Sequence, residues 1–245
     1  MKTCTYLGIL GGLGPMSTVY FCELLNRHTA ATCDADHIDM LISSRATTPD
    51  RTAYILDKNS PDPLPVMLAD AHRLERAGVD LIVVPCNTAH YFYDGLTKSC
   101  KTPILNIIDE TTAHLVRTGV KTFGLLATVG TIQSGAYERF CAPRGLTCLT
   151  PTEEEQKIIS DIIFGQIKQK KAVDMDAFGR VVDSLRSLGC ERIVLGCTEL
   201  SLLKKQGLDE DIFVDSLDVL AHRTILACGK MPVDFPTSFD MEVAQ

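Results

Sequence analysis

The chain has 245 residues, of which 45% are hydrophobic and 22% charged, the composition of an ordinary globular protein with one or two domains. Its 24 basic and 31 acidic side chains give a net charge of −7, and only Lys168, Lys170 and Lys171 cluster, which argues against a nucleic-acid partner. No stretch reaches the ~18 apolar residues of a membrane span, so we expect no membrane contact.

Short apolar runs rich in β-branched residues alternate along the chain with longer amphipathic segments. The runs are typical of parallel strands buried on both faces, and the longer segments are typical of helices. The expected strands cover residues 6–10, 37–43, 80–84, 103–105, 122–126, 145–149, 192–195 and 212–214. The expected helices cover residues 15–29, 64–77, 88–99, 109–117, 132–140, 153–169, 174–188 and 216–228. This alternation predicts an α/β fold, followed by a loosely held tail over residues 232–245.

Two segments about half a chain apart are similar to each other. Residues 80–88 read DLIVVPCNT and residues 191–199 read ERIVLGCTE, and residues 7–12 resemble residues 123–128 with nearly the same offset. This repeat predicts two pseudo-symmetric domains, each a parallel sheet flanked by helices. We place the first domain in residues 1–106 plus 215–245, with the C-terminal helix packing back on it, and the second in residues 107–214.

The ten cysteines include no Cys-x-x-Cys pair, so neither a zinc ribbon nor a thioredoxin-type site is expected. Residues 1–12 show no signal-peptide cleavage pattern. Free thiols in a reducing cytoplasm are the simplest interpretation.

Ligands of parallel sheets bind beyond the carboxyl ends of the strands. The segments that hold this position are residues 11–18, 85–90, 127–131 and 196–199. Two facing domains would bring Cys86 and Cys197 to opposite walls of an interdomain cleft, which we expect to be the active site.

Two facing thiols can invert a carbon centre that bears an acidic proton. One cysteine, as thiolate, removes the proton from one face, and the other, as thiol, returns a proton to the opposite face. N–H groups at a helix start can lower a thiol pKa, and a threonine that suits such a start follows each cysteine. The resulting aci-carboxylate needs preorganised donors. Since no metal motif is evident, the candidates are backbone N–H groups, Asn87, Thr88, Thr128 and Thr198.

Two basic residues favour an acidic substrate. Arg51 lies in a polar loop after the second expected strand, on the ligand side of the sheet, and an arginine can bind a carboxylate through two parallel N–H bonds. Lys168 ends an expected helix, where a cation also interacts favourably with the helix dipole. Each could instead be a solvated surface residue.

Other functions are compatible with parts of the sequence. Gly12-x-Gly14-x-x-Ser17 resembles a dinucleotide fingerprint, but the third glycine and the acidic residue after the second strand are missing. Cys86 and His90 could share a helix face as zinc ligands, yet no second Cys/His pair has matching spacing. A cysteine hydrolase would need a histidine held by an orienting residue, and none is readable. A binding protein whose two lobes close on a small anion stays open, and it would not catalyse exchange of a substrate proton.

Three motifs, LGGLGP at residues 10–15, PCNTAH at residues 85–90 and GCTEL at residues 196–200, resemble the aspartate/glutamate racemase family, aspartate racemases in particular. Residues 49–55 and 150–157 are similar as well. The resemblance implies a cytoplasmic racemase with two α/β domains, often a homodimer, that interconverts L- and D-aspartate and acts less well on glutamate. It also implies that no pyridoxal phosphate, other cofactor or metal is needed.

The same resemblance implies roles for the residues around the two cysteines. Cys86 and Cys197 match the two catalytic cysteines. Asn87 and Thr88 match residues that hold the substrate carboxylate beside the first cysteine, and Thr198 matches the corresponding position beside the second.

The resemblance also implies that three further residues lie next to the substrate. Arg51 and Lys168 match basic residues that recognise the second carboxylate, and the backbone of Leu13 would approach the ligand. Glutamate racemases, hydantoin racemases and maleate cis–trans isomerases are related to this family, so they remain alternatives.

Overall fold

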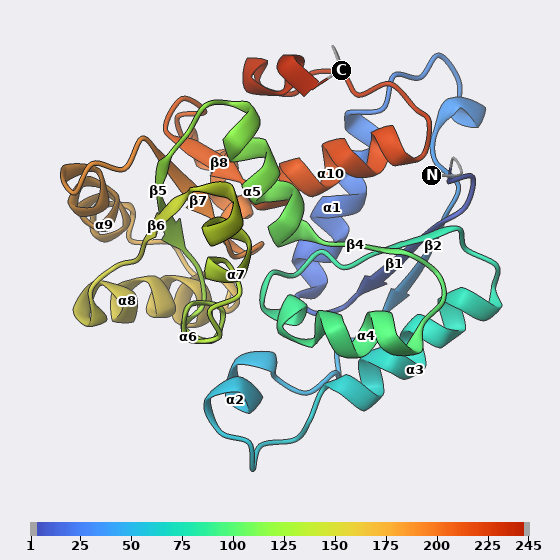
Figure 1. Ribbon diagram of the computed structural model, residues 1–245, viewed down its shortest axis with the longest axis horizontal. Coiled ribbons are helices and arrows are strands. Elements are labelled where there is room, and N and C mark those ends of the chain that lie inside the picture. The colour runs from blue at the N-terminus through green and yellow to red at the C-terminus, as the bar shows by residue number, and fades with distance from the viewer. Residues whose placement is uncertain (1–3, 243–245) are drawn as a thin grey trace.

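The computed structural model describes residues 4–242 and contains two four-stranded parallel sheets with helices on both faces (Figure 1). The first sheet has the strand order β2-β1-β3-β4 and the second the order β6-β5-β7-β8. The two sheets therefore have the same topology. The expected α/β class and its two similar parallel-sheet units are confirmed.

Each expected strand is present within a few residues of its predicted bounds. The first sheet consists of β1 (Leu7–Gly11), β2 (Met40–Ser44), β3 (Leu81–Val83) and β4 (Ile104–Leu105), and the second of β5 (Thr122–Leu126), β6 (Thr147–Leu149), β7 (Arg192–Leu195) and β8 (Phe213–Asp215). The adjacent strands β1 and β3 are buried along their whole length, which explains why they read as continuous apolar runs.

Helices cover both faces of each sheet. Between the sheets lie α1 (Pro15–Arg27), α5 (Ile107–Arg117) and α10 (Ser216–Ala227); the outer faces carry α3 (Leu64–Arg76), α4 (Tyr93–Ser99), α8 (Glu153–Ser160) and α9 (Met175–Ser187). The connections contain α2 (Arg51–Leu56), α6 (Val129–Gln133), α7 (Glu138–Cys141) and the 3₁₀ turns η1 (Asp34–Asp36), η2 (Thr88–Phe92), η3 (Ala142–Arg144), η5 (Leu200–Gln206) and η6 (Thr237–Glu242). A π-helical segment, η4 (Asp161–Ile167), continues α8.

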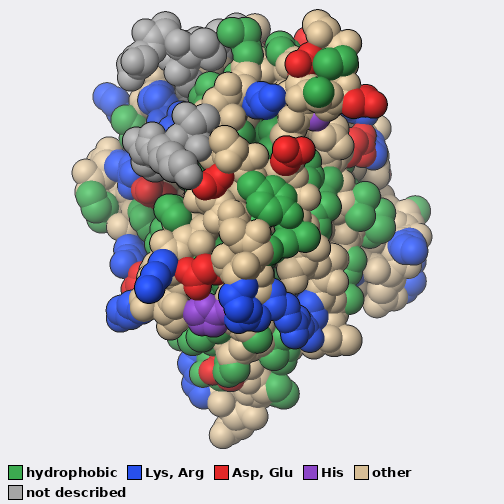
Figure 2. All heavy atoms as spheres, turned by 90° about the vertical axis from the view of Figure 1, so that its right-hand side faces the viewer, with side chains coloured by type: hydrophobic (Ala, Val, Ile, Leu, Met, Phe, Trp, Pro, Cys, Tyr) green, Lys and Arg blue, Asp and Glu red, His purple; other side chains and the backbone are tan. Residues whose placement is uncertain are grey.

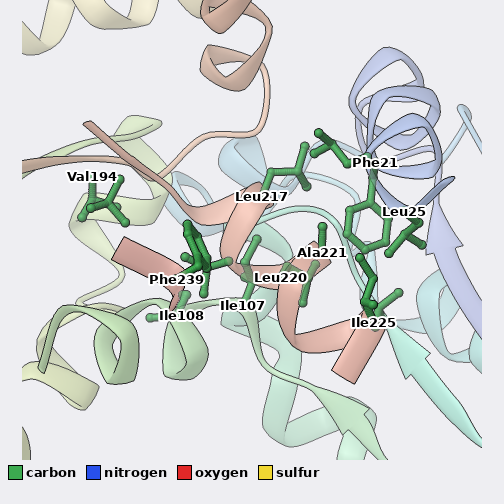
Figure 3. Close-up of a cluster of buried hydrophobic side chains, with 14 of the residues drawn as sticks. Phe21, Leu25, Ile107, Ile108, Val194, Leu217, Leu220, Ala221, Ile225 and Phe239 are labelled. Atoms are coloured by element: carbon green, nitrogen blue, oxygen red, sulfur yellow. The ribbon is translucent and has the colours of Figure 1, made fainter. Parts of the chain in front are cut away.

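A single hydrophobic cluster joins the two sheets through α1, α5 and α10. Figure 3 shows the side chains of α10 gathered with those of α1 and α5 between the two halves. Helix α10 is buried on most of its surface, and it contacts both α1 and α5. The expected domain boundaries stay a prediction, because this cluster runs without a break across them.

Three expected helices differ in detail from the observed ones. The helix over residues 88–99 begins as η2 before α4, and the helix over residues 153–169 ends as the π-helical segment. The helix over residues 132–140 is divided into α6 and α7, and Gly135 between them takes a positive φ of 63°. A positive φ interrupts helical hydrogen bonding, so the helix cannot continue through this residue.

The tail expected to be loosely held is instead attached to the core, up to the end of the described residues. Thr29 and Pro232 form an antiparallel bridge, and the Val233 amide donates to the carbonyl oxygen of His28 at 2.9 Å. Phe239 is 4% exposed and belongs to the central cluster. The prediction was wrong because Phe235 and Phe239, four positions apart in a largely polar segment, pack into or against this cluster, and two residues are too few to reveal a periodicity; the last residues, 243–245, lie outside the described part.

The surface mixes charges of both signs. Figure 2 shows basic and acidic side chains interspersed on one face, with hydrophobic side chains between them. Within residues 4–242, no helix is both long and apolar enough to cross a membrane.

Candidate active site

One pocket, with about 310 Å³ of empty space including its mouth, lies at the carboxyl ends of strands from both sheets. All nine residues singled out from the sequence line it: Leu13, Arg51, Cys86, Asn87, Thr88, Thr128, Lys168, Cys197 and Thr198. Asp50, Thr52, Phe164 and Glu199 line it as well. Parallel sheets bind ligands where their strand order reverses. In each sheet this point lies after the two inner strands, where its cysteine loop is found, and the packing of the two sheets brings both loops to one pocket.

The first cysteine loop follows β3. Cys86 is buried, and η2 starts two residues later. The backbone N–H of Ala89, in the first turn of η2, acts to lower the pKa of Cys86. The turn therefore points a peptide donor at the thiol, as expected for a cysteine that precedes a helical turn.

The second cysteine loop follows β7 and repeats this arrangement. The Gly196 amide donates to the Leu126 carbonyl oxygen at 2.8 Å, and a Cβ at Gly196 would come within 2.5 Å of the Leu125 side chain. A larger residue at this position would therefore have to displace the Leu125 side chain. Cys197 is buried, and the backbone N–H of Glu199 acts to lower its pKa.

The two thiols differ in their charged neighbours. Burial raises the pKa of Cys86, and the positive charge of Arg51 opposes this effect. The pKa of Cys197 is raised well above its ordinary value by burial and then by the charge of Glu199. The backbone N–H groups lower the pKa values of both cysteines, as the sequence suggested, but burial raises these pKa values by more. Cys197 is thus favoured as the thiol, whereas Arg51 favours the thiolate of Cys86.

Glu199 was not singled out from the sequence, yet its carboxylate is central to the pocket. It is 7% exposed and accepts a hydrogen bond from the Cys197 thiol, with Sγ and Oε2 3.1 Å apart. Its Oε1 lies 3.6 Å from the ammonium nitrogen of Lys168. Gly14, at a φ of 138°, leaves room for this oxygen, because a Cβ there would come within 2.5 Å of it.

Arg51 is the first residue of α2, not part of a loop as expected. The Asp50 side chain caps this helix by accepting from the Ala53 amide at 2.8 Å. The Arg51 guanidinium donates to the carbonyl oxygens of Pro49 at 3.0 Å and Leu13 at 2.9 Å. Its Nε is buried and has no hydrogen-bond partner among the described residues. One N–H of Arg51 is therefore available to a ligand, and the Leu13 backbone holds the arginine in place.

Lys168 immediately follows the π-helical segment η4. Its amide donates to the carbonyl oxygen of Ile163, five residues earlier, at 3.1 Å. The Lys168 ammonium lies 4.6 Å from the centre of the Phe164 ring. Such π-turns are rare and occur often at functional sites. The wider turn presents both side chains to the pocket.

The polar side chains of the pocket are bonded to one another across the two halves. The hydroxyls of Thr88, Thr128 and Thr131 form a ring with oxygen–oxygen distances of 2.9, 2.9 and 3.0 Å. The Asn87 carboxamide is bonded through its nitrogen to Ser216, at the start of α10, and through its oxygen to Tyr137, just before α7; the Thr198 hydroxyl lies 3.4 Å from the Pro85 carbonyl oxygen. Their direct contact with a substrate stays a prediction.

His90 packs behind the pocket and supports the Cys86 loop. The Ile107 amide donates to His90 Nε2 at 3.3 Å, so Nδ1 carries the ring proton and donates to the Cys86 carbonyl oxygen at 2.9 Å. Burial lowers the pKa of this ring to about 4. No group of three or more His, Cys, Asp or Glu side chains within the described residues is arranged to hold a metal ion.

Acid is expected to destabilise the protein through His90. The unfolded chain binds this proton near pH 6.5, whereas the folded ring binds it only near pH 4. The stabilisation is therefore present above pH 6.5 and is lost as the pH falls to 4, by about 3 kcal/mol. Urea unfolding of wild type and His90→Asn across this range measures the effect, and the variant should show the weaker pH dependence. Parallel curves would contradict this account of His90.

Three of the pocket residues missed in the sequence carried signals that could have found them. Glu199 follows Cys197 by two residues in a segment already placed at a strand end, and Asp50 has the side chain of a helix cap before Arg51. Phe164 precedes Lys168 by four residues, the spacing of one helix face.

Comparisons with known proteins give consistent matches over most of the chain. A family model described as Asp/Glu/Hydantoin racemase matches residues 10–224. The broad specificity amino-acid racemase RacX of Bacillus subtilis is 28% identical over 224 residues, covering 89% of this chain and 96% of RacX. The glutamate racemase of Aquifex pyrophilus is 31% identical over 143 residues, covering 54% and 51%. The structure of the aspartate racemase from Picrophilus torridus superposes with a TM-score of 0.83 and 27% identity, covering 97% of this chain and 98% of the other.

Proposed function

The chain belongs to the Asp/Glu/hydantoin racemase family and is an amino-acid racemase, and from this premise we propose that it interconverts L- and D-aspartate without a cofactor. The observation that carries the proposal is the pair of buried cysteines, Cys86 and Cys197, on one pocket. They follow equivalent strands of two sheets with the same topology. A pocket with a thiol from each sheet can approach one carbon atom from two sides.

In the proposed reaction the two thiols exchange roles in each turnover. The Cys86 thiolate removes the α-proton, and the Cys197 thiol delivers its own proton to the opposite face of the carbanion. The product enzyme then holds Cys86 as thiol and Cys197 as thiolate, the form that acts on the other enantiomer. The hydrogen bond from Cys197 to Glu199 favours the first form in the free enzyme. Because thiols carry both protons, the step itself needs no carbonyl cofactor.

An acidic substrate is supported by the charges that face the pocket. The Arg51 Nε–H is buried and unpartnered among the described residues, so a carboxylate is the group that would satisfy it. Lys168 supplies a second positive charge, which in the free site lies near Glu199. A substrate side-chain carboxylate that contacts Lys168 competes with Glu199 for its ammonium group, so this contact gains less free energy. Arg51 is therefore proposed as the stronger of the two carboxylate ligands.

The proton abstraction also needs donors for the aci-carboxylate. The ring of Thr88, Thr128 and Thr131 fixes three hydroxyls at the pocket wall, and two of these residues line the pocket. Each hydroxyl has a single proton, so a hydroxyl that donates to the substrate gives up one bond of this ring. We assign Thr88 and Thr128, with backbone N–H groups, to the substrate α-carboxylate.

The test is chiral chromatography of separate L-aspartate and L-glutamate incubations with no added cofactor. D-aspartate should form, and faster than D-glutamate. If neither acid is inverted, the proposal is wrong, and hydantoins and maleate become the next substrates to examine.

A second candidate, a racemase of broad specificity, is favoured by one observation. A hollow of about 840 Å³, including its open mouth, adjoins the pocket and shares four charged lining residues with it, Asp50, Arg51, Lys168 and Glu199. Its wall also includes the apolar side chains of Met16, Ile167 and Leu202. Longer neutral side chains could extend into this space, as expected of a relative of RacX. Inversion of L-leucine or L-methionine at a rate similar to that of L-aspartate would favour this candidate.

A further inference from the structure

Two sets of hydrogen bonds tie the two cysteine loops together. The Thr198 hydroxyl, next to Cys197, donates to the carbonyl oxygen of Pro85, next to Cys86, at 3.4 Å. The second set is longer and runs through Ser216. Asn87 Nδ2 donates to the Ser216 hydroxyl at 2.9 Å, and this hydroxyl donates to the carbonyl oxygen of Leu195 at 2.7 Å. It thus connects the residue after Cys86 to the last residue of β7, two positions before Cys197.

Tyr137 fixes the remaining end of the Asn87 side chain. Its hydroxyl donates to Asn87 Oδ1 at 2.8 Å. Burial raises the pKa of Tyr137 well above its ordinary value, so the hydroxyl keeps its proton. Because Ser216 gives its own proton to Leu195, it can only accept from Asn87. Both carboxamide atoms therefore have one fitting partner each, and the amide is held in a single orientation.

The bridge is entirely buried. Asn87 is 1% exposed, and Ser216 and Tyr137 are fully buried. Hydrogen bonds in such surroundings are costly to leave unmade, because no water replaces the lost partner. The network connects Asn87, which follows β3 of the first sheet, to Ser216 at the start of α10 and to Tyr137 just before α7. A change at either end would alter the spacing of the two cysteine loops.

We propose that Ser216 and Tyr137 are positioning residues, which act through Asn87 to set the separation of the Cys86 and Cys197 thiols. The inference rests on the proposed racemisation. Neither residue lines the pocket. Both thiols must reach one α-carbon from opposite faces, and a misplacement of about 1 Å can lower a rate about 100-fold. The bridge makes the Asn87 side chain a structural link between the loops, so its contribution to the substrate is confined to its backbone and its remaining N–H.

The variants Ser216→Ala and Tyr137→Phe test the proposal with little change in shape. We expect kcat to fall about 10- to 100-fold with a smaller change in KM, since Arg51, the proposed carboxylate ligand, stays in place. In D₂O the variants should also incorporate deuterium into recovered substrate without inversion. A displaced second thiol delays protonation from the far face, and the first thiol then exchanges its proton with solvent and returns deuterium to the face it left.

Matched controls separate this effect from a loss of folded protein. Thr224 is also a fully buried hydroxyl residue of α10, but its hydroxyl donates to the Leu220 carbonyl oxygen of its own helix. Tyr93 donates to the Ile104 carbonyl oxygen. Thr224→Val and Tyr93→Phe should keep the wild-type ratio of exchange to inversion. A lower kcat in the bridge variants with that ratio unchanged, or an unchanged kcat, would overturn the proposal.

Hydrogen exchange of backbone amides gives a readout that needs no turnover. In Ser216→Ala, amides of residues 86–89 and 196–199 should both exchange faster than in wild type, while Thr224→Val should leave them unchanged. Unaltered exchange at both loops would refute the bridge even if the protein proved to have another substrate. If the wild type inverts no amino acid, the proposed function is refuted. The hydrogen-exchange comparison would then still test whether the bridge holds the two cysteine loops.

Discussion

Replacement of either Cys86 or Cys197 by alanine is expected to lower kcat for racemisation by about 100- to 10,000-fold. Each thiol is proposed to transfer one of the two protons, and a positioned acid or base contributes about 100- to 10,000-fold. Loss of one thiol therefore leaves the carbanion without a base to form it or without an acid on the far face. The measurement is the initial rate of D-aspartate formation by chiral chromatography, with enzyme concentration set by the folded fraction.

Cys190→Ala is the matched control for these variants. Cys190 is buried, packs against the side of β5 near Gly124, and does not line the pocket. Its replacement should lower stability slightly and leave kcat unchanged. Full activity in either Cys86→Ala or Cys197→Ala would contradict the two-thiol mechanism, whatever the control shows.

Arg51→Lys is expected to lower kcat/KM for aspartate about 100-fold. A lysine cannot bind the two carbonyl oxygens through terminal nitrogens and also offer a separate N–H to the substrate. The guanidinium holds the Pro49 and Leu13 carbonyl oxygens while its Nε stays free for a carboxylate. A single ammonium cannot do both, and hydrogen bonds to a charged group are worth about 1.5–3 kcal/mol. Steady-state rates with aspartate give the effect.

Arg45→Lys is a fitting control for the loss of a guanidinium elsewhere. Arg45 binds both carboxylate oxygens of the buried Asp70, through Nε at 2.6 Å and Nη2 at 2.9 Å, and does not line the pocket. The Arg45→Lys substitution should lower the melting temperature of the protein and leave kcat/KM for aspartate unchanged. An unchanged kcat/KM in Arg51→Lys would remove Arg51 from the carboxylate site. An equal loss with neutral amino acids would do the same.

The fold could be predicted from the sequence to a large extent because its strands are buried on both faces. Residues 7–11 and 81–83 form continuous apolar runs, and the similar segments around Cys86 and Cys197 show that the pattern repeats. The helix α2 escaped prediction because its six residues are too few for helical periodicity and none of them is buried. The family resemblance carried by the three motifs is confirmed by the match over residues 10–224.

The candidate site could be predicted where it depends on strand ends, and less where it depends on contacts between distant residues. Cys86, Cys197 and Thr128 each follow an inner strand, so the topology places each at the ligand-binding edge of its own sheet, and the sequence repeat predicts that the two edges face each other. Tyr137 lies 50 positions from Asn87, and its role depends on how α7 packs against the first half. No local pattern reports such a contact. The π-turn before Lys168 is similarly invisible, since its residues read as ordinary helix.

The central claim is that two thiols on opposite faces of the substrate carry out racemisation. The most direct test is the early reaction of wild-type enzyme with L-aspartate in D₂O, with both enantiomers separated and their α-deuterium measured by mass spectrometry. We predict that D-aspartate forms with deuterium at the α-carbon, while recovered L-aspartate keeps its proton. D-aspartate that retains the original proton, or deuterium present equally in both enantiomers from the start, would show a single base and contradict the account.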